Sequence, residues 1–224
     1  MAISLRQIEP ADVPEAGRIY HDAFKAIAAQ HNFPPAFADP EVAIGRLSQL
    51  CTNPGFYGVV AELDGTIVGS NFLDERSAIN GLGPITVDPM VQNRSVGEAL
   101  MEHMLDRAVR NNAPGVRLVQ AGYHNRSLCL YTRLGFAVRE ALVILQGAPL
   151  AITLAGCAVR KATAADGEAC DRLCRAVHGH DRGRELRDAV TRGPLRWSSA
   201  TAGLPATRLR LPDAAMPSPR RTRI

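Results

Sequence analysis

The 224-residue sequence predicts an α+β fold, with a mixed and mostly antiparallel central sheet and helices on both of its faces. One indication is Asp64-Gly65, which joins two strand-like runs and is typical of an antiparallel hairpin. A second is that segments with apolar residues at helical spacing precede this hairpin and alternate with strand-like runs after it. A single sheet covered by helices accommodates both patterns.

The first half of the chain predicts one strand, two helices and the hairpin. Asp12 lies near the start of the first helix, and the segment His31 to Pro35, with its two prolines, interrupts the helical pattern. In chain order, we expect a strand at 3–8, helices at 11–28 and 40–50, and hairpin strands at 57–62 and 66–72.

The second half predicts alternating strands and helices. Ile85, Thr86 and Val87 favour a strand, which Asp88-Pro89 ends, and apolar residues then recur at helical spacing up to about residue 109. After these we expect a strand at 116–121, a short helix beginning near Ser127, and strands around Val138 and Val143.

The segment Gln92 to Gly97 lies between that strand and that helix and predicts an anion site. Glycine at the start of a helix lets the backbone approach a ligand, and the first-turn N–H groups lack partners within the helix. These amides and the helix dipole suit a phosphate or pyrophosphate. The chain lacks both Gly-Lys-Ser/Thr and Gly-x-Gly-x-x-Gly at this place, which argues against a P-loop and against a dinucleotide fingerprint.

This segment resembles the Gln-x-x-Gly-x-Gly motif with which the GCN5-related N-acetyltransferases (GNAT superfamily) bind the pyrophosphate of acetyl-CoA. Gln92, Val96 and Gly97 fit the motif, and Ser95 stands where the family has its first glycine. Because serine disfavours a positive φ, we expect Ser95 to weaken cofactor binding. The resemblance implies acetyl-CoA as co-substrate, bound by Ile85, Val87, Gln92, Asn93, Arg94, Ser95, Val96, Gly97 and Asn125.

A second match to the family follows the strand expected at 116–121. The residues themselves predict Asn125 as the N-cap of a short helix and Gly135 as the glycine after its end. In the family, an asparagine at this place commonly binds the pantetheine arm, and a tyrosine in the helix commonly protonates the departing thiolate. Asn125 and Tyr131 occupy those positions, so the resemblance implies Tyr131 as the catalytic acid.

The resemblance covers about the first two thirds of the chain and implies a GNAT domain at 1–150. It implies a sheet in which two central strands splay apart to admit the pantetheine. The implied reaction is direct transfer of an acetyl group from acetyl-CoA to an amine in a ternary complex. The expected partner is a small-molecule or peptide amine, and the sequence leaves an oligomer open.

The general base is less evident. The place where some family members carry a glutamate is near Gly81, so that carboxylate is absent. Asp74, Glu75 and His124 are substitutes by proximity, each with a role as a surface or capping group as the alternative. Phe33 and Phe37 are candidates for an acceptor pocket, or they pack their own loop down.

Composition excludes several other classes. Residues 1–156 hold 12 Lys and Arg against 15 Asp and Glu, a net charge of −3, whereas residues 157–224 hold 14 against 7, a net charge of +7. The basic charge therefore lies outside the motifs, and we expect no nucleic-acid partner. No run approaches a membrane span and no secretory h-region begins the chain, so we expect a cytoplasmic protein. The five cysteines form no metal pattern, and Cys170 and Cys174 read as small core side chains.

An internal repeat appears at an offset of 154 residues. The segments 4–12 and 158–166 match, which predicts an incomplete second GNAT-like repeat at 156–193, with chance similarity as the alternative. Residues 194–224 are rich in Ala, Arg, Pro and Ser and read as a disordered basic tail. Such a composition also results when GC-rich codons are translated out of frame, so a lost second domain is one hypothesis for the tail.

Two functions other than an acetyltransferase stay open. Ser95 and the missing base favour a catalytically inactive acyl-CoA-binding or regulatory module. The basic tail favours an interaction protein whose globular part is a scaffold.

Overall fold

The computed structural model describes residues 3–143, 156–192 and 196–200. Residues 3–75 and 79–137 form the first of two units, and residues 76–78, 138–143, 156–192 and 196–200 belong to the second. In the first unit the helices and strands are β1 (Ile3–Gln7), η1 (Pro10–Asp12), α1 (Val13–Gln30), α2 (Pro40–Thr52), β2 (Phe56–Leu63), β3 (Thr66–Asp74), β4 (Ile79–Leu82), β5 (Thr86–Val87), η2 (Pro89–Val91), α3 (Val96–Arg110), β6 (Gly115–Arg117) and α4 (Asn125–Arg133).

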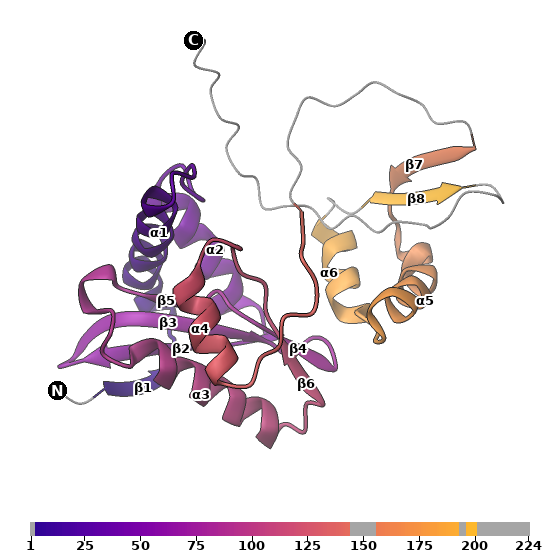
Figure 1. The fold of residues 1–224 in the computed structure, drawn as a ribbon. Coiled ribbons are helices and arrows are strands. Elements are labelled where there is room, and N and C mark those ends of the chain that lie inside the picture. The colour runs from indigo at the N-terminus through magenta and orange to yellow at the C-terminus, as the bar shows by residue number, and fades with distance from the viewer. Residues whose placement is uncertain (1–2, 144–155, 193–195, 201–224) are drawn as a thin grey trace, which may run out of the picture. The chain divides into compact units, whose positions relative to one another are not determined.

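The first unit has three layers, because neighbouring residues of its central strands point to opposite faces of the sheet. On β2, Val59 and Ala61 pack into a core cluster with Leu100 of α3, whereas Val60 packs into a second cluster with Leu47 of α2. The sheet thus separates α1 and α2 from α3, as Figure 1 shows. The helices on each face of the sheet bury their apolar sides against it.

The sheet runs in the order β1, β2, β3, β4, β6, and β5 pairs with β3 beyond the end of β4. All of these pairs are antiparallel except β4 with β6, which is parallel. After Leu82, the chain passes through Gly83 and Pro84 to β5, which keeps β3 as its neighbour while β6 stays with β4. The two strands β5 and β6 therefore diverge, as the splayed pair expected from the sequence requires.

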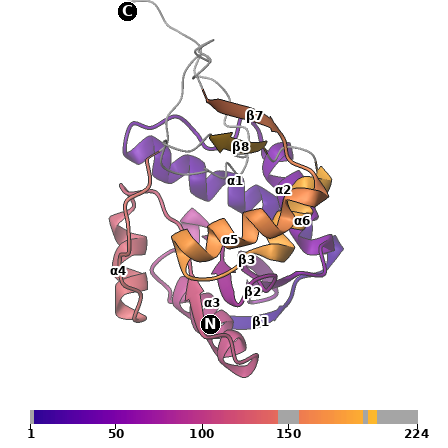
Figure 2. The same cartoon turned by 90° about the vertical axis from the view of Figure 1, so that its right-hand side faces the viewer.

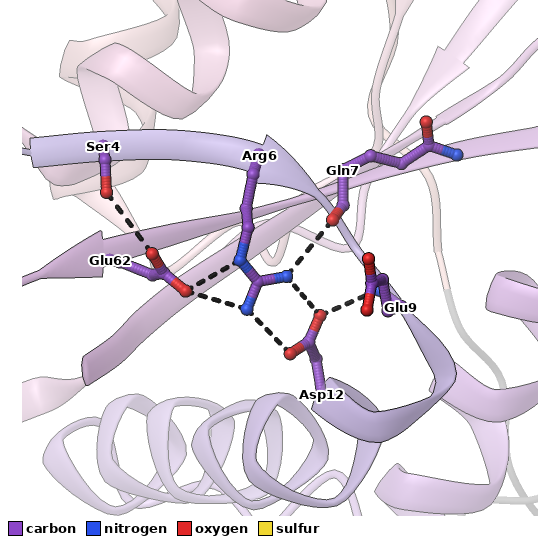
Figure 3. A network of polar contacts seen from close by, with 6 residues as sticks. All are labelled: Ser4, Arg6, Gln7, Glu9, Asp12 and Glu62. Carbon is purple, nitrogen blue, oxygen red and sulfur yellow. Dashed lines mark hydrogen bonds and ion pairs between the residues drawn. The ribbon is translucent and has the colours of Figure 1, made fainter. Parts of the chain in front are cut away.

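A buried carboxylate fixes the corner between β1 and α1. Arg6 of β1 donates from its two terminal nitrogens to the oxygens of Asp12, at 2.6 and 2.8 Å, and the backbone N–H of Glu9 donates to Asp12 at 2.8 Å. Arg6 also bonds Glu62 of β2 at 2.8 Å (Figure 3). The Arg6 hydrogen bonds, followed by that of the Glu9 amide, lower the pKa of Asp12.

The second unit consists of β7 (Cys157–Lys161), η3 (Ala164–Asp166), α5 (Gly167–His178), α6 (Gly183–Arg192) and β8 (Arg196–Ala200). β7 and β8 are antiparallel and lie side by side in both views (Figure 1, Figure 2). Cys170 and Cys174 are buried with Ala162 and Leu186, which confirms them as core residues. Burial raises the pKa of the Cys170 thiol to about 11.

The structure corrects three expectations from the sequence. Residues 138–143 form no strand, and the rest of the segment expected there, 144–155, lies outside the described residues. The segment expected to be disordered from residue 194 includes β8, which pairs with β7, while residues 193–195 and 201–224 lie outside the described part. The strand expected at 116–121 is shorter, Gly115–Arg117, because only this stretch pairs with β4.

No helix among the described residues is both long enough and apolar enough to cross a membrane.

Candidate active site

The segment before α3 turns through two left-handed residues. Asn93 has φ 69° and Ser95 has φ 59°, and Ser95 is the N-cap of α3. The Ser95 side chain makes no capping hydrogen bond, so it leaves the first-turn amides of α3 available to another acceptor. A backbone that alternates into the left-handed region turns successive N–H groups inward and forms an anion-binding concavity. These residues therefore fit a pyrophosphate.

Gly97, in the first turn of α3, lies beside α4 and β5. A Cβ added there would lie 3.6 Å from the side chain of Leu130 in α4 and 3.7 Å from that of Val87 in β5, both ordinary van der Waals distances. The open side of Gly97 thus faces protein atoms.

Gln92 connects this turn to the strand before it and to the helix after it. Its Nε2 donates to the carbonyl oxygen of Val87 at 3.3 Å, and its Oε1 accepts from Arg126 of α4 at 2.7 Å. Glu98 of α3 accepts a further hydrogen bond from Arg133 of α4 at 2.9 Å. The structure therefore brings the start of α3, the end of β5 and helix α4 together.

The capping residue of helix α4 lies one position earlier than predicted. The N-cap is His124, whose Nδ1 accepts from the backbone N–H of Ser127 at 3.3 Å, and Asn125 is the first helical residue. The prediction of Asn125 as N-cap is wrong, because the imidazole takes the role that an asparagine amide usually fills. Gly135 ends the helix with φ 91°, as expected.

Tyr131 is buried in the first core cluster, with 7% of its surface exposed. Burial raises the pKa of its phenol, and a hydrogen bond from Ser127 opposes this by stabilising the phenolate. The phenol is therefore protonated near neutral pH, as a proton donor has to be.

The two carboxylates at the end of β3 have different surroundings. Asp74 lies directly across from Gly81 of β4, and a Cβ added at Gly81 would be 3.3 Å from the Asp74 Cβ and 4.0 Å from its Oδ2. Glu75 accepts from Arg107 at 2.6 and 3.0 Å and from Asn111 at 2.9 Å, which occupies both of its oxygens.

His124 is less basic than an ordinary histidine. Its pKa is lowered by burial first and by the charge of Arg126 next, so the ring is neutral at pH 7.

The two phenylalanines proposed for an acceptor pocket are in different places. Phe37 is buried in the second core cluster, where its ring lies 4.7 Å from that of Tyr20, so it packs the loop down. Phe33 is 52% exposed and stacks on Tyr123 at 4.4 Å, and His31 lies 5.2 Å from the same tyrosine ring. Of the two phenylalanines, Phe33 is therefore the one open to a ligand.

Three residues of this region were not predicted from the sequence to belong to the site. Ser127 lies four residues before Tyr131, a spacing that puts two side chains on one helix face and so could have identified it. Arg126 and Tyr123 carried no comparable signal, because their partners Gln92 and Phe33 are distant in the chain. In the part of the chain that the structure describes, no group of three His, Cys, Asp or Glu side chains could hold a metal ion.

The family of the acetyltransferase (GNAT) domain matches residues 54–138. BH1408 from Bacillus halodurans has a TM-score of 0.57 at 12% identity, over 65% of this chain and 99% of its own. The PaiA N-acetyltransferase from Thermoplasma acidophilum, in complex with coenzyme A, has a TM-score of 0.55 at 16% identity, over 63% of this chain and 93% of its own.

A predicted acetyltransferase from Clostridium acetobutylicum, solved with acetyl-CoA, has a TM-score of 0.50 at 11% identity, over 65% of this chain and 96% of its own. No curated protein matches the sequence. The family match contains the turn before α3, Asn125 and Tyr131, and the matched structures share the layered fold around them. Residues 54–138 are therefore similar to the acetyltransferase (GNAT) domain, and the first unit shares the α+β fold of these structures.

Proposed function

We propose that this protein is an N-acetyltransferase that moves an acetyl group from acetyl-CoA to a small-molecule or peptide amine by direct attack in a ternary complex. The observation that carries the proposal is the left-handed turn at Asn93 and Ser95, placed where β5 and β6 diverge and beside the helix of Tyr131. We call residues 92–97 the cradle. An anion cradle, a gap between strands and a buried acid are together what a coenzyme A thioester requires.

We assign to the cofactor-binding residues the roles that the resemblance to the GNAT family implies. The backbone amides from Gln92 to Gly97 hold the pyrophosphate, and Arg94 and Arg126 add positive charge beside it. Backbone groups of Ile85 and Val87 and the side chain of Asn125 bind the pantetheine arm. Acetyl-CoA supplies the activated thioester carbonyl.

Tyr131 acts as the acid. Its hydroxyl gives a proton to the thiolate as the carbon–sulfur bond breaks, and its burial keeps that proton on the oxygen until then.

For the base we favour Asp74. The family's glutamate position falls near Gly81, and the cross-strand register puts the Asp74 carboxylate beside the place that a side chain at Gly81 would fill. Asp74 therefore accepts a proton from the amine, directly or through a water molecule.

A thiol-release assay over a panel of primary amines and peptides tests the proposed reaction. We expect release of coenzyme A that depends on the amine, and in Tyr131→Phe a kcat lower by about a hundredfold with acetyl-CoA binding retained. Tyr57→Phe is the matched control, because the Tyr57 hydroxyl bonds His103 on a different helix, α3. Tight acetyl-CoA binding without release on any amine would instead support the inactive acyl-CoA-binding module.

The proposed base has its own test. Asp74→Asn should lower kcat/KM near neutral pH and restore part of it at higher pH, where more of the amine is already neutral. Glu41→Gln, which removes an acid from the first turn of α2, is the control. Equal effects of the two substitutions would remove Asp74 from the mechanism.

We also propose that residues 156–193 descend from a second copy of the opening of the first unit. β7, η3 and the start of α5 coincide with β1, η1 and the start of α1 at an offset of 154 residues. Arg160 donates to both oxygens of Asp166 at 2.6 and 2.8 Å, and the Thr163 N–H donates to Asp166 at 2.8 Å, which repeats the corner of Figure 3. Translating the gene in its other two frames after codon 194 tests the idea, since a lost second domain requires strand and cradle motifs there.

A further inference from the structure

Helix α4 lies with one face along the cradle and the first turn of α3. Arg126 donates from Nη1 to Oε1 of Gln92 at 2.7 Å, and a Cβ added at Gly97 would lie 3.6 Å from the side chain of Leu130. Residues four apart share a helix face, so Arg126 and Leu130 point to the same side of α4. Arg126 is therefore the side chain by which α4 reaches the first residue of the cradle.

The two arginines of α4 have partners of different charge. Arg133 donates to the carboxylate of Glu98 at 2.9 Å, so these two charges compensate each other. Arg126 donates to the amide of Gln92, which is neutral, and no carboxylate among the described residues pairs with it. Gln92 uses one of the five N–H groups of the guanidinium, which leaves the charge and the other donors for an anion.

Gln92 is itself fixed at both ends of its amide. Its Nε2 donates to the carbonyl oxygen of Val87 at 3.3 Å, at the end of β5, while its Oε1 accepts from Arg126. The amide thus orients the guanidinium beside the left-handed turn at Asn93 and Ser95 without cancelling its charge. A glutamate at the same position would instead form an ion pair with Arg126 and would repel an anion.

We propose that Gln92 positions Arg126 to bind the diphosphate of coenzyme A, so that α4 supplies a side-chain ligand in addition to the main-chain amides of the cradle. The planar guanidinium donates charge-assisted hydrogen bonds to phosphate oxygens. The diphosphate is the anion concerned, because Gln92, which holds Arg126, is the first residue of the cradle. Arg126 is a binding residue and Gln92 a positioning residue, and the inference rests on the proposed binding of acetyl-CoA.

Calorimetry of the full chain with coenzyme A, which carries no acetyl group to transfer, tests the contact. We expect Arg126→Gln to raise the Kd about fivefold, less than the loss of a buried charge-assisted hydrogen bond would, because Arg126 is exposed. Dephospho-coenzyme A, which keeps the diphosphate and lacks the 3′-phosphate, should give the same ratio. Arg110→Gln is the matched control, because it removes an exposed arginine from the last turn of α3, about 20 Å along the helix from the cradle.

A double-mutant cycle tests the role of Gln92. Gln92→Met keeps the length of the side chain and the main-chain N–H of the cradle, and it removes both contacts of the amide. Since Gln92 acts through Arg126, this substitution should weaken coenzyme A binding less in the Arg126→Gln background than in the wild type. Loss of the Val87 contact is common to both backgrounds and cancels. Equal losses in the two backgrounds overturn the positioning role.

The outcomes separate this inference from the proposed function. Coenzyme A that binds the wild type and Arg126→Gln equally well overturns the inference alone, and so does an equal loss in Arg110→Gln, which would reflect net charge only. A ratio that disappears with dephospho-coenzyme A overturns the assignment to the diphosphate. Coenzyme A that fails to bind the wild type overturns the proposed function, and this inference with it.

Discussion

At the scale of the residue, Ser95 shows where the strain of the cradle lies. The sequence predicts that serine in place of glycine weakens cofactor binding, yet Ser95 already has φ 59° as part of the fold. A non-glycine residue in this region costs about 1–2 kcal/mol. The strain is therefore already present in the fold without a ligand.

Ser95→Gly should accordingly raise the free energy of unfolding by about 0.5–1 kcal/mol, after allowance for the greater freedom of glycine in the unfolded chain. Urea denaturation measures this change, and calorimetry with acetyl-CoA should give an affinity close to that of the wild type. Asn112→Gly, at φ 56° after α3, is the control with a smaller expected gain, because asparagine tolerates this region. A large gain in affinity without a gain in stability would contradict this account.

At the scale of the element, the first turn of α3 packs against β5 and α4 through Gly97. Since a Cβ there meets Leu130 and Val87 at ordinary contact distance, Gly97→Ala should fit. We expect it to stabilise the protein by about 0.5–1 kcal/mol through helix propensity and to leave acetyl-CoA binding intact. Gly69→Ala is the contrast, because its Cβ would lie 2.6 Å from the carbonyl oxygen of Thr86 and would force β3 and β5 apart.

The corner between β1 and α1 predicts a pH dependence. The pKa of Asp12 is lowered in the folded state by the Arg6 hydrogen bonds, so this carboxylate stabilises the fold above its ordinary value of 3.8, and the contribution is lost as the pH falls further. Arg6→Gln should cost about 1–3 kcal/mol at pH 6, and its difference from the wild type should narrow at pH 3 and below. Arg18→Gln, whose partners Glu15 and Asp22 are exposed on α1, should cost less at both pH values. Urea unfolding at the two pH values measures both differences.

The elements that were predicted from sequence are those with a local cause. The turn at Asp64-Gly65 has positive φ at both residues, 51° and 80°, as a hairpin with Asp-Gly requires, and α3 starts directly after the loop that was singled out. β4 was missed, because Ile79–Leu82 is short and contains Gly81. It pairs with Leu73 and Asp74 of β3, a contact between strands that no local pattern reveals.

The candidate site likewise contains features that the sequence predicted and features that it could not predict. Gln92, Gly97 and Tyr131 form a pattern along the chain, and the structure brings them together through β5, α3 and α4. The cap of α4 by His124 depends on which atom of the imidazole faces the Ser127 N–H, and no spacing in the sequence reveals that orientation.

At the scale of the whole molecule, the apolar cores follow the division into two units. Two clusters, built from residues between Ile3 and Phe136, hold the sheet and the helices of the first unit, whereas Ala162, Cys170, Cys174 and Leu186 make a cluster of their own. Among the described residues of the second unit, this cluster contains four buried side chains, all small or medium, and such a core supplies little hydrophobic stabilisation. We therefore expect the second unit to open at a lower free energy than the first.

Leu186→Ala tests this difference in stability. Leu186 is 2% exposed, and truncating such a leucine costs about 2–5 kcal/mol, which is large against what four core residues can supply. Hydrogen exchange should become faster in α5 and α6 and stay unchanged in α3, and acetyl-CoA binding should persist. Leu100→Ala, at a fully buried position of the first core, should do the reverse: faster exchange in α3 and weaker acetyl-CoA binding. Loss of acetyl-CoA binding in Leu186→Ala would show that the two cores unfold as one.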